Sequence, residues 1–182
     1  MKKLLLVFFL CCISAFLALS QPIANFGSNL QAGCGAVQII FLDSSSVSDA
    51  KIISWKWDLG GVISDKHNPG RIFDKPGKYT ICLTVTDDKN RSHQVCKEEY
   101  IIIYDKPQAD FTIDKTSGCV PFTVNFADLS KSTNGALINW TWDIGGNSNV
   151  INTNDKTLPI QTTYETQGLK SATLTIKDDK GC

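Results

Sequence analysis

The residues of this 182-residue chain that could carry chemistry are its cysteines, histidines, paired aspartates and tryptophans. His67 and His93 are the only histidines, they lie far apart in the sequence, and no Cys-x-x-Cys pair is present. Clustered ligands for a metal are therefore missing, and no nucleophile-elbow pattern points to a Ser-His-Asp or Cys-His set. The sequence predicts surface histidines, no catalytic residue, no metal site and no cofactor.

Aspartates occupy several positions where turns are expected. Asp87-Asp88 and Asp178-Asp179 could act as paired carboxylates or as calcium ligands. Aspartate is also a preferred turn residue, and both pairs lie in expected hairpin turns, which favours the turn role. Asp58 and Asp143 each precede a glycine pair, and we expect their side chains to accept hydrogen bonds from the backbone of that turn.

The four tryptophans lie in two Trp-x-Trp-Asp segments, as Trp55 and Trp57 and again as Trp140 and Trp142. Exposed tryptophans bind polysaccharides by stacking on sugar rings, which would make them a glycan site. Each pair is also in period-two register with aliphatic residues such as Ile53, and that face is expected to form the core of a sandwich. The sequence favours core packing over sugar binding.

An internal repeat positions these residues. A shift of 85 residues brings residues 22–61 onto residues 107–146 with 14 identities in 40 positions. The shift then becomes 91 and brings residues 77–89 onto 168–180. The change of six residues lies between the two registers, at 62–72 in the first copy and 147–163 in the second. Insertions accumulate in surface loops, so this stretch is expected to be a loop in both copies.

Each copy has the alternation of β-strands. Apolar residues recur at period two in residues 37–41, 53–59 and 79–85, and the same pattern returns at 122–126 and 138–144. Residues 87–90 form a turn, and residues 95–104 form a long closing strand. No apolar stripe has helical spacing. The sequence therefore predicts an all-β protein made of two β-sandwiches in tandem.

The two copies carry a family resemblance. WKWDLGG and WTWDIGG, with the later strands PGKYTICLTVTDD and QGLKSATLTIKDD, resemble PKD (polycystic kidney disease) repeats over residues 22–182. The resemblance implies immunoglobulin-like sandwiches of the kind common in bacterial surface and secreted proteins. The family often has Gly-Asp-Gly after the motif aspartate, whereas Gly60-Gly61 and Gly145-Gly146 lack the second aspartate. This departure weakens any carry-over of a calcium role to this position.

Residues 1–20 are expected to be a signal peptide. Lys2 and Lys3 precede an uncharged stretch from Leu4 to Leu19, and a small-x-small pattern ends at Ser20. The alternative is an uncleaved anchor, but 16 residues fall short of the roughly 20 that span a bilayer. Residues 21–105 then form the first PKD-like sandwich and residues 106–182 the second. The second copy stops inside the turn before its last strand, so we expect the chain to be the N-terminal fragment of a longer protein.

Five cysteines remain after residue 20, and in an oxidising compartment they are expected to pair. Cys82 and Cys96 flank the turn at Lys89 symmetrically, which predicts a bridge across the last two strands. In an immunoglobulin-like sandwich the first and last turns lie at opposite ends, so Cys119 should be too far from Cys182 to bridge. An interdomain bridge between Cys34 and Cys182 is one hypothesis, with Cys119 unpaired until a third repeat follows. Ordinary pairing within a domain, with one free thiol, is the other.

The charge balance and the resemblance together define the expected function. The formal net charge is zero, and it becomes −2 without Lys2 and Lys3, so nucleic-acid binding is disfavoured. No membrane insertion is expected after signal cleavage. The resemblance implies a non-enzymatic spacer or a module for protein or glycan interaction in a longer secreted or cell-surface, adhesin-like protein, with neighbouring PKD-like repeats as partners. The alternative is that the repeats are accessory modules of a secreted protease or glycosidase whose catalytic domain lies beyond residue 182.

Overall fold

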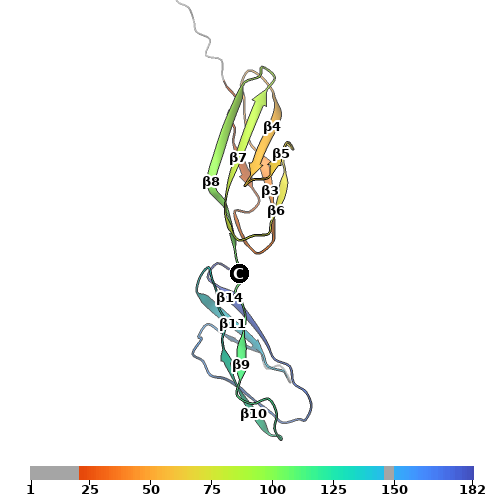
Figure 1. Cartoon of the computed structure of the whole chain (residues 1–182), viewed down its shortest axis with the longest axis vertical. Coiled ribbons are helices and arrows are strands. Elements are labelled where there is room, and N and C mark those ends of the chain that lie inside the picture. Colours follow the sequence, from red (N-terminus) through yellow and green to blue (C-terminus); the bar gives the residue numbers. More distant parts are fainter. Residues whose placement is uncertain (1–20, 146–149) are drawn as a thin grey trace, which may run out of the picture.

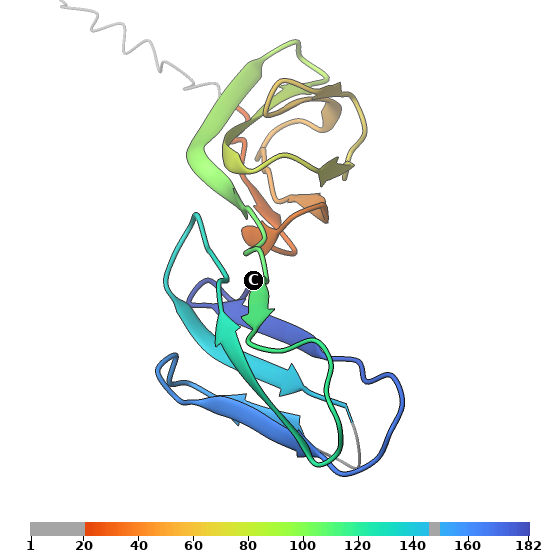
Figure 2. The ribbon, with the colours of Figure 1, turned by 60° about the horizontal axis from the view of Figure 1, so that its bottom comes forward.

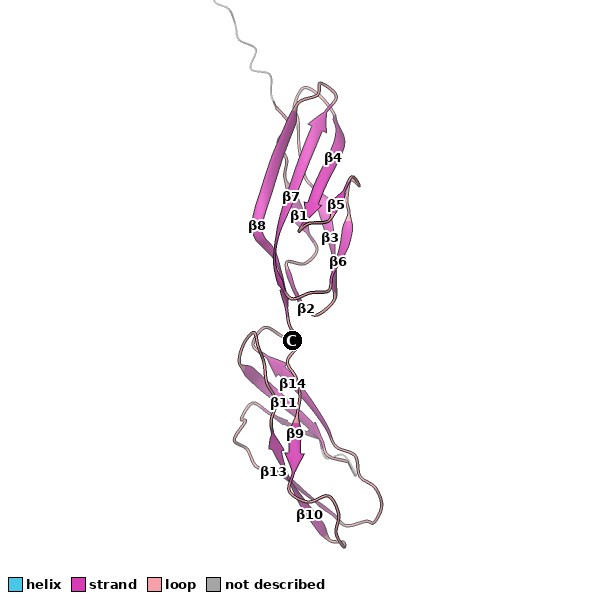
Figure 3. Cartoon of the chain, viewed as in Figure 1, coloured by secondary structure: helices cyan, strands magenta, loops and turns pink. Residues whose placement is uncertain are grey.

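The computed structural model describes residues 21–145 and 150–182, and within these residues all regular structure is β (Figure 3). The expected signal peptide at residues 1–20 lies outside the described residues. Two elongated β-bodies follow one another along the long axis of the molecule (Figure 1). We call β1–β8 the first repeat and β9–β14 the second repeat. The prediction of an all-β fold with two tandem sandwiches is confirmed.

The first repeat is a sandwich of two sheets. One sheet has the strand order β1-β3-β6 and the other has the order β2-β8-β7-β4-β5. The strands are β1 (Phe26–Ser28), β2 (Ala32–Cys34), β3 (Val37–Asp43), β4 (Ile52–Leu59), β5 (Ile63–Ser64), β6 (Gly70–Phe73), β7 (Gly77–Asp87) and β8 (Ser92–Tyr104). Apolar residues at alternate positions of the two sheets meet in one core, in which Phe41, Trp57 and Leu83 are almost completely buried.

The second repeat copies this arrangement. Its sheets have the orders β13-β10-β9 and β12-β11-β14. The strands are β9 (Phe111–Ile113), β10 (Phe122–Asp128), β11 (Leu137–Asp143), β12 (Val150–Thr153), β13 (Ile160–Tyr164) and β14 (Thr173–Asp178). Its separate core contains Phe126, Trp142 and Leu174. Because each repeat buries its own apolar residues, each has the core of an independent domain.

Two strands of the first repeat, β8 and β2, have no counterpart among the described residues of the second. In the first repeat β7 pairs with β4 on one side and with the 13-residue strand β8 on the other. In the second repeat β14 pairs with β11, and no strand of the described residues lies along its other edge. The second half of β8 also forms a parallel pair with β2, with Cys34 opposite Tyr104. The matching residues around Cys119 are not in a strand.

The Trp-x-Trp strands contain a β-bulge that sequence alternation alone does not reveal. The register of β4 shifts between Ile52 and Ser54, and that of β11 shifts between Leu137 and Asn139. An extra residue in one strand reverses the facing of the residues before it. Ile53 is therefore 59% exposed, and the expectation that it shares the core face of the tryptophans is wrong. The preceding Ile52 packs against the core instead.

The two repeats meet end to end at a narrow junction (Figure 2). β8 runs the length of the first repeat and leads through residues 105–110 into β9 of the second. Cys182 is placed at the same junction, so the last residue of the chain returns to the point where the second repeat begins (Figure 1).

Candidate functional site: the bridged junction between the repeats

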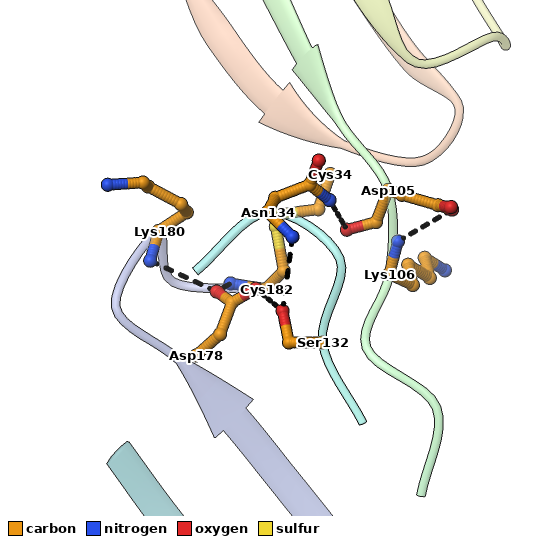
Figure 4. Close-up of a disulfide and its surroundings, with 8 residues drawn as sticks. All are labelled: Cys34, Asp105, Lys106, Ser132, Asn134, Asp178, Lys180 and Cys182. Atoms are coloured by element: carbon orange, nitrogen blue, oxygen red, sulfur yellow. Dashed lines mark hydrogen bonds between the residues drawn. A yellow bond between two sulfur atoms is a disulfide. The ribbon is translucent and has the colours of Figure 1, made fainter. Parts of the chain in front are cut away.

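A disulfide crosses the junction between the two repeats. Cys34 and Cys182 are bonded at 2.08 Å between sulfurs and 5.5 Å between Cα atoms, and they are separated by 148 residues (Figure 4). Cys34 ends β2 of the first repeat, whereas Cys182 lies in the turn after β14 of the second. The bond therefore joins the first-turn end of one sandwich to the last-turn end of the next.

A buried aspartate holds the turn that carries Cys182. The Asp178 carboxylate accepts hydrogen bonds at one oxygen from the backbone N–H groups of Lys180 (3.0 Å) and Cys182 (2.9 Å). Its other oxygen accepts a hydrogen bond from the Ser132 hydroxyl at 3.2 Å (Figure 4). These three bonds satisfy a side chain that is fully buried. The turn role that the sequence favoured for this aspartate agrees with the geometry.

The other half of the bridge is held by the parallel pairing of β2 with β8. Gly35 follows Cys34 and donates its backbone N–H to the carbonyl of Tyr104 at 2.9 Å. It has φ of 63°, and an added Cβ would lie 2.8 Å from the side chain of Lys106. A residue with a side chain is disfavoured in this left-handed conformation, so glycine is the residue that fits the chain reversal after the cysteine.

A second contact ties the linker to the second repeat. The Asn134 side-chain amide donates a hydrogen bond to the backbone carbonyl of Asp105 at 3.0 Å, next to the disulfide (Figure 4). Asn134 is half-buried, but the hydrogen bond itself is exposed, so it competes with water and adds little stability on its own. It is a direct contact between the linker and the second repeat.

At the corresponding turn of the first repeat, ion pairs take the place of the disulfide. Arg91 occupies the position of Cys182, since its backbone N–H also bonds to the buried turn aspartate, Asp87, at 2.9 Å. Its guanidinium contacts Asp87 and also Asp49, at 2.7 Å each. Asp49 occupies the position of Asn134. The two junction residues of the second repeat, Cys182 and Asn134, therefore correspond to charged residues in the first.

The hydrogen bonds and ion pairs described above lower the pKa values of the Asp49 and Asp87 carboxyls. The Arg91 and Lys89 side chains hold the pKa of Asp49 well below its usual range. Burial raises the pKa of Asp87, but hydrogen bonds from the backbone and side chain of Arg91 outweigh that effect and leave the pKa lowered. Both groups are therefore anionic at neutral pH, and Arg91 has a partner for each part of its guanidinium.

The second disulfide lies inside the first repeat. Cys82 of β7 and Cys96 of β8 are directly opposite in the antiparallel register and are bonded, with Cα atoms 4.1 Å apart. Cys119 is exposed, and among residues 21–145 and 150–182 it is the one cysteine without a bond. The structure thus pairs Cys34 with Cys182 and Cys82 with Cys96, and leaves Cys119 unpaired.

An aspartate at the end of β3 and of β10 anchors the first tryptophan of each motif. Asp43 accepts a hydrogen bond from Trp55 Nε1 at 2.9 Å, and Asp128 accepts one from Trp140 Nε1 at 3.0 Å. Burial raises the pKa of both carboxyls, but hydrogen bonds from neighbouring serines and from the indoles outweigh it, so both pKa values are lowered. This role was not predicted from the sequence, although the two aspartates coincide in the repeat alignment.

The second tryptophan of each motif is a core residue. Trp57 and Trp142 are 0% and 2% exposed, and each packs on a phenylalanine of the first strand of its repeat. A buried indole has no face free for a sugar ring, which agrees with the core interpretation. The Trp57 Nε1 atom is buried and has no hydrogen-bond partner.

The motif aspartates lie at the turns that follow. Asp58 accepts a hydrogen bond from the Gly61 backbone N–H at 2.6 Å, and Asp143 accepts one from that of Gly145 at 3.3 Å. Gly145 has φ of 65°, and an added Cβ would lie 2.4 Å from the carbonyl oxygen of Ser171. A side chain there would collide with backbone, so the turn requires glycine. Gly146 lies outside the described residues.

The histidines are placed in different elements. His93 Nδ1 accepts a hydrogen bond from the Ala24 backbone N–H at 2.9 Å, and His67 Nε2 lies 3.1 Å from the Asp43 carboxylate. The His67 ring also packs against Trp55, with centroids 4.4 Å apart and the ring planes tilted by 51°. Over residues 21–145 and 150–182, no group of three or more His, Cys, Asp or Glu side chains is arranged to hold a metal ion.

An apolar groove of 730 Å³ opens beside Cys119. It is lined by core-facing residues of the second repeat, including Phe111, Phe122 and Tyr164. In the first repeat the matching space is filled by the end of β8, where Ile101 and Ile103 are buried in the core. The groove is therefore a strand position of the sandwich and not a ligand pocket separate from the fold.

No helix of the described chain is long and apolar enough to cross a membrane.

Two sandwiches that share their strand order, their Trp-x-Trp-Asp segment and their turn aspartate define a tandem immunoglobulin-like module. The PKD domain family model matches residues 19–103 and 104–182, which together make up most of the chain. The chain belongs to the PKD domain family, and the prediction of that family is confirmed.

Relatives in sequence are larger proteins. The pre-pro-metalloprotease PrtV of Vibrio cholerae is 26% identical over 133 residues, covering 68% of this chain and 13% of that protein. The collagenase ColQ1 of Bacillus cereus is 40% identical over 50 residues, covering 27% of this chain and 5% of that protein. The chain thus spans about an eighth or less of the length of the curated relatives it matches.

Solved structures similar to this chain include single PKD domains. The PKD1 domain of Vibrio cholerae metalloprotease PrtV is 31% identical, with a TM-score of 0.40, and covers 45% of this chain and 98% of that one. The PKD1 domain of Vibrio anguillarum Epp is 27% identical, with a TM-score of 0.41, and covers 46% of this chain and 95% of that one.

Proposed function

We propose that this chain is a non-catalytic, extracellular PKD-repeat segment that acts as a spacer with a fixed geometry between its two repeats. The proposal includes the bounds of the two repeats, residues 21–105 for the first and 106–182 for the second. The observation that carries the proposal is the Cys34–Cys182 disulfide, which adds a second covalent connection to the linker. Two connections remove the hinge motion that a single short linker allows between domains.

Location outside the cell is part of this proposal. Two disulfides persist in an oxidising compartment, which agrees with secretion by the expected leader at residues 1–20. Attachment to the cell surface and a role in adhesion belong to the same proposal, as does contact with a surface protein or glycan.

Removing the bridge tests the spacer role. In the Cys34→Ser variant we expect the two repeats to keep their folds and to sample a wider range of relative orientations, because the linker alone then joins them. Small-angle X-ray scattering of the oxidised wild type and the variant measures this as a broader distribution of interatomic distances. A Cys82→Ser/Cys96→Ser variant is the control, since it removes a disulfide inside one repeat. Distance distributions of equal breadth for the wild type and Cys34→Ser would contradict a spacer whose geometry is fixed by the disulfide.

The second candidate function is that of an accessory module of a hydrolase. It is favoured by the similarity to a metalloprotease and a collagenase, which are the proteins that carry the matching segments. An accessory module that targets a substrate would bind it without cleaving it. Co-sedimentation of the chain with insoluble collagen separates the two candidates. Retention on the collagen favours the accessory role, and recovery of all protein in the supernatant favours the spacer.

A further inference from the structure

The two repeats present matching ends in different chemical states. We call residues 33–35 and 118–120 the loop ends, and the turns at 87–91 and 178–182 the turn ends. Each loop end carries a Gly-Cys pair at the same repeat position. In the first repeat that cysteine, Cys34, is bonded to the turn end of the next repeat. In the second repeat it is Cys119, which is exposed and free.

No other cysteine of the described chain can reach Cys119. Cys34, Cys82, Cys96 and Cys182 are already paired. Cys119 lies beside the residues that lead into β14, whereas Cys182 follows the far end of that strand. A strand of 6 residues spans about 20 Å, which is well beyond the Cα separation of about 7 Å that a disulfide tolerates.

The turn ends show which partner the loop-end cysteine accepts. Cys182 stands four residues after the buried Asp178, and its backbone N–H donates a hydrogen bond to the Asp178 carboxylate, which holds the backbone of the cysteine in place. In the first repeat the same position holds Arg91, whose guanidinium is occupied by Asp87 and Asp49. A turn end therefore occurs in this chain in two forms, one that bridges to a loop end and one that is closed by an ion pair.

We propose that the loop end around Cys119 is a covalent docking site for the turn end of another PKD repeat, one that carries a cysteine four residues after its buried turn aspartate. The proposal goes beyond the spacer role because it identifies a partner and a site for it. The same repeat position in the first repeat makes this bond within the molecule, where the pairing of β2 with β8 holds the loop end. That interface is the template for the docking, although residues 118–120 themselves are not in a strand.

The bond forms by thiol–disulfide exchange. The thiols of Cys119 and of the partner cysteine lose two protons and two electrons in total and join in one S–S bond. A small-molecule or protein disulfide, such as oxidised glutathione, takes up these electrons and protons and is reduced to two thiols. Exposure of Cys119 gives the exchanging disulfide access to its sulfur.

Converting the turn end of the first repeat into the bridging form tests the site. The variant Val47→Ser/Asp49→Asn/Arg91→Cys places the residues of the second repeat (Ser132, Asn134 and Cys182) at the matching positions of the first. The serine supplies a donor to Asp87 in place of the lost guanidinium, as Ser132 does for Asp178. Folded in a glutathione redox buffer, this chain is expected to form head-to-tail oligomers that join Cys119 to the introduced cysteine.

Two controls separate docking from random oxidation. Adding Cys119→Ser should abolish the oligomer ladder on a non-reducing gel. The variant Val47→Ser/Asp49→Asn/Ser92→Cys moves the new thiol one residue along the exposed start of β8 and should give several-fold fewer mixed bonds in peptide mapping. Equal yields of mixed bonds in the two cysteine variants, or only symmetric bonds in the folded first variant, would overturn the proposal.

A second measurement needs no variant. Disulfide mapping of the protein from its natural source, with free thiols blocked at lysis, identifies the partner of the peptide that contains Cys119. A cross-linked peptide with a cysteine four residues after an aspartate supports the docking site. Recovery of Cys119 as a blocked free thiol or a glutathione adduct contradicts it. Neither result depends on whether the segment acts as a spacer, which the scattering experiment measures separately.

Discussion

At the scale of single residues, one aspartate in each repeat connects the two sheets. Asp43 lies at the end of β3 and binds the indole of Trp55, which belongs to β4 in the opposite sheet. Asp128 and Trp140 repeat the contact between β10 and β11. A charge-assisted hydrogen bond of this kind is stronger than one between neutral groups, and it orients the indole.

Replacing this carboxylate should destabilise the first repeat. In Asp43→Asn, one acceptor oxygen becomes a donor, which leaves one of the N–H or O–H donors around this side chain without a partner. The side chain is only 7% exposed, so we expect the free energy of unfolding to fall by about 1–3 kcal/mol. Urea denaturation of the full chain measures this change. Asp65→Asn, at an exposed position, is the control and should change stability little.

The lowered pKa values make stability depend on pH in the acid range. The pKa values of Asp43, Asp87 and Asp128 are all lower in the folded chain than their usual value. Their contribution is therefore fully present above the unfolded pKa of about 3.9 and is lost as pH falls through the folded values.

We accordingly expect the contribution of these carboxylates to the unfolding free energy to be constant above about pH 5 and to fall steeply below about pH 4. Asp43→Asn and Asp128→Asn variants should show a shallower fall than the wild type. Denaturant titrations at pH 7 and pH 3 provide the comparison. A double variant with the same difference between the two pH values as the wild type would show that these carboxylates do not carry the acid sensitivity.

Sequence reasoning identified most of these residues but not all of their contacts. The turn roles of Asp87 and Asp178 follow from their type and their place in a hairpin. The indole anchors Asp43 and Asp128 look like ordinary strand-end residues, because their partners come from a strand 12 residues further on. Asn134 lies in a loop, and its bond to Asp105 arises only when the two repeats are placed end to end. Such contacts depend on tertiary geometry, which residue type and spacing do not encode locally.

At the scale of elements, the β-bulge in β4 decides which side chains reach the core. The extra residue at Ile52–Ser54 leaves Trp57 and Leu59 facing inward and turns Ile53 to solvent. The matching shift in β11 exposes Ile138 at 45%. The two sandwich cores were predictable from alternation, whereas a bulge adds a residue without a marker in the sequence.

Truncating side chains on the two sides of β4 tests which of them face the core. Leu59→Ala removes a side chain that is 1% exposed and should cost about 3 kcal/mol of unfolding free energy. Ile53→Ala removes a similar volume from the solvent side and should change stability by no more than about 0.5 kcal/mol. Thermal and urea unfolding of the two variants measure the contrast. Similar losses for both would show that Ile53 packs in the core after all.

At the scale of the whole molecule, the two repeats have the same architecture and unequal ends. The turn end of the first repeat is closed by Arg91, and the turn end of the second is bonded to Cys34. In the proposed spacer, the disulfide adds a second connection to the linker and so limits the orientations that the two repeats can take relative to each other. From the N-terminus to the C-terminus, the turn end with the ion pair comes before the turn end with the disulfide, so the two turn ends differ in their chemistry.

The position of the Cys34–Cys182 bridge also determines how the segment behaves under tension. Force applied to residue 21 and to Cys182 passes through residues 21–34 and then across the sulfur–sulfur bond, so it bypasses the 147 residues between the two cysteines. The 13 residues before Cys34 extend by at most about 45 Å. Under oxidising conditions the second repeat would therefore stay folded while the chain is pulled, and after reduction it would become extensible.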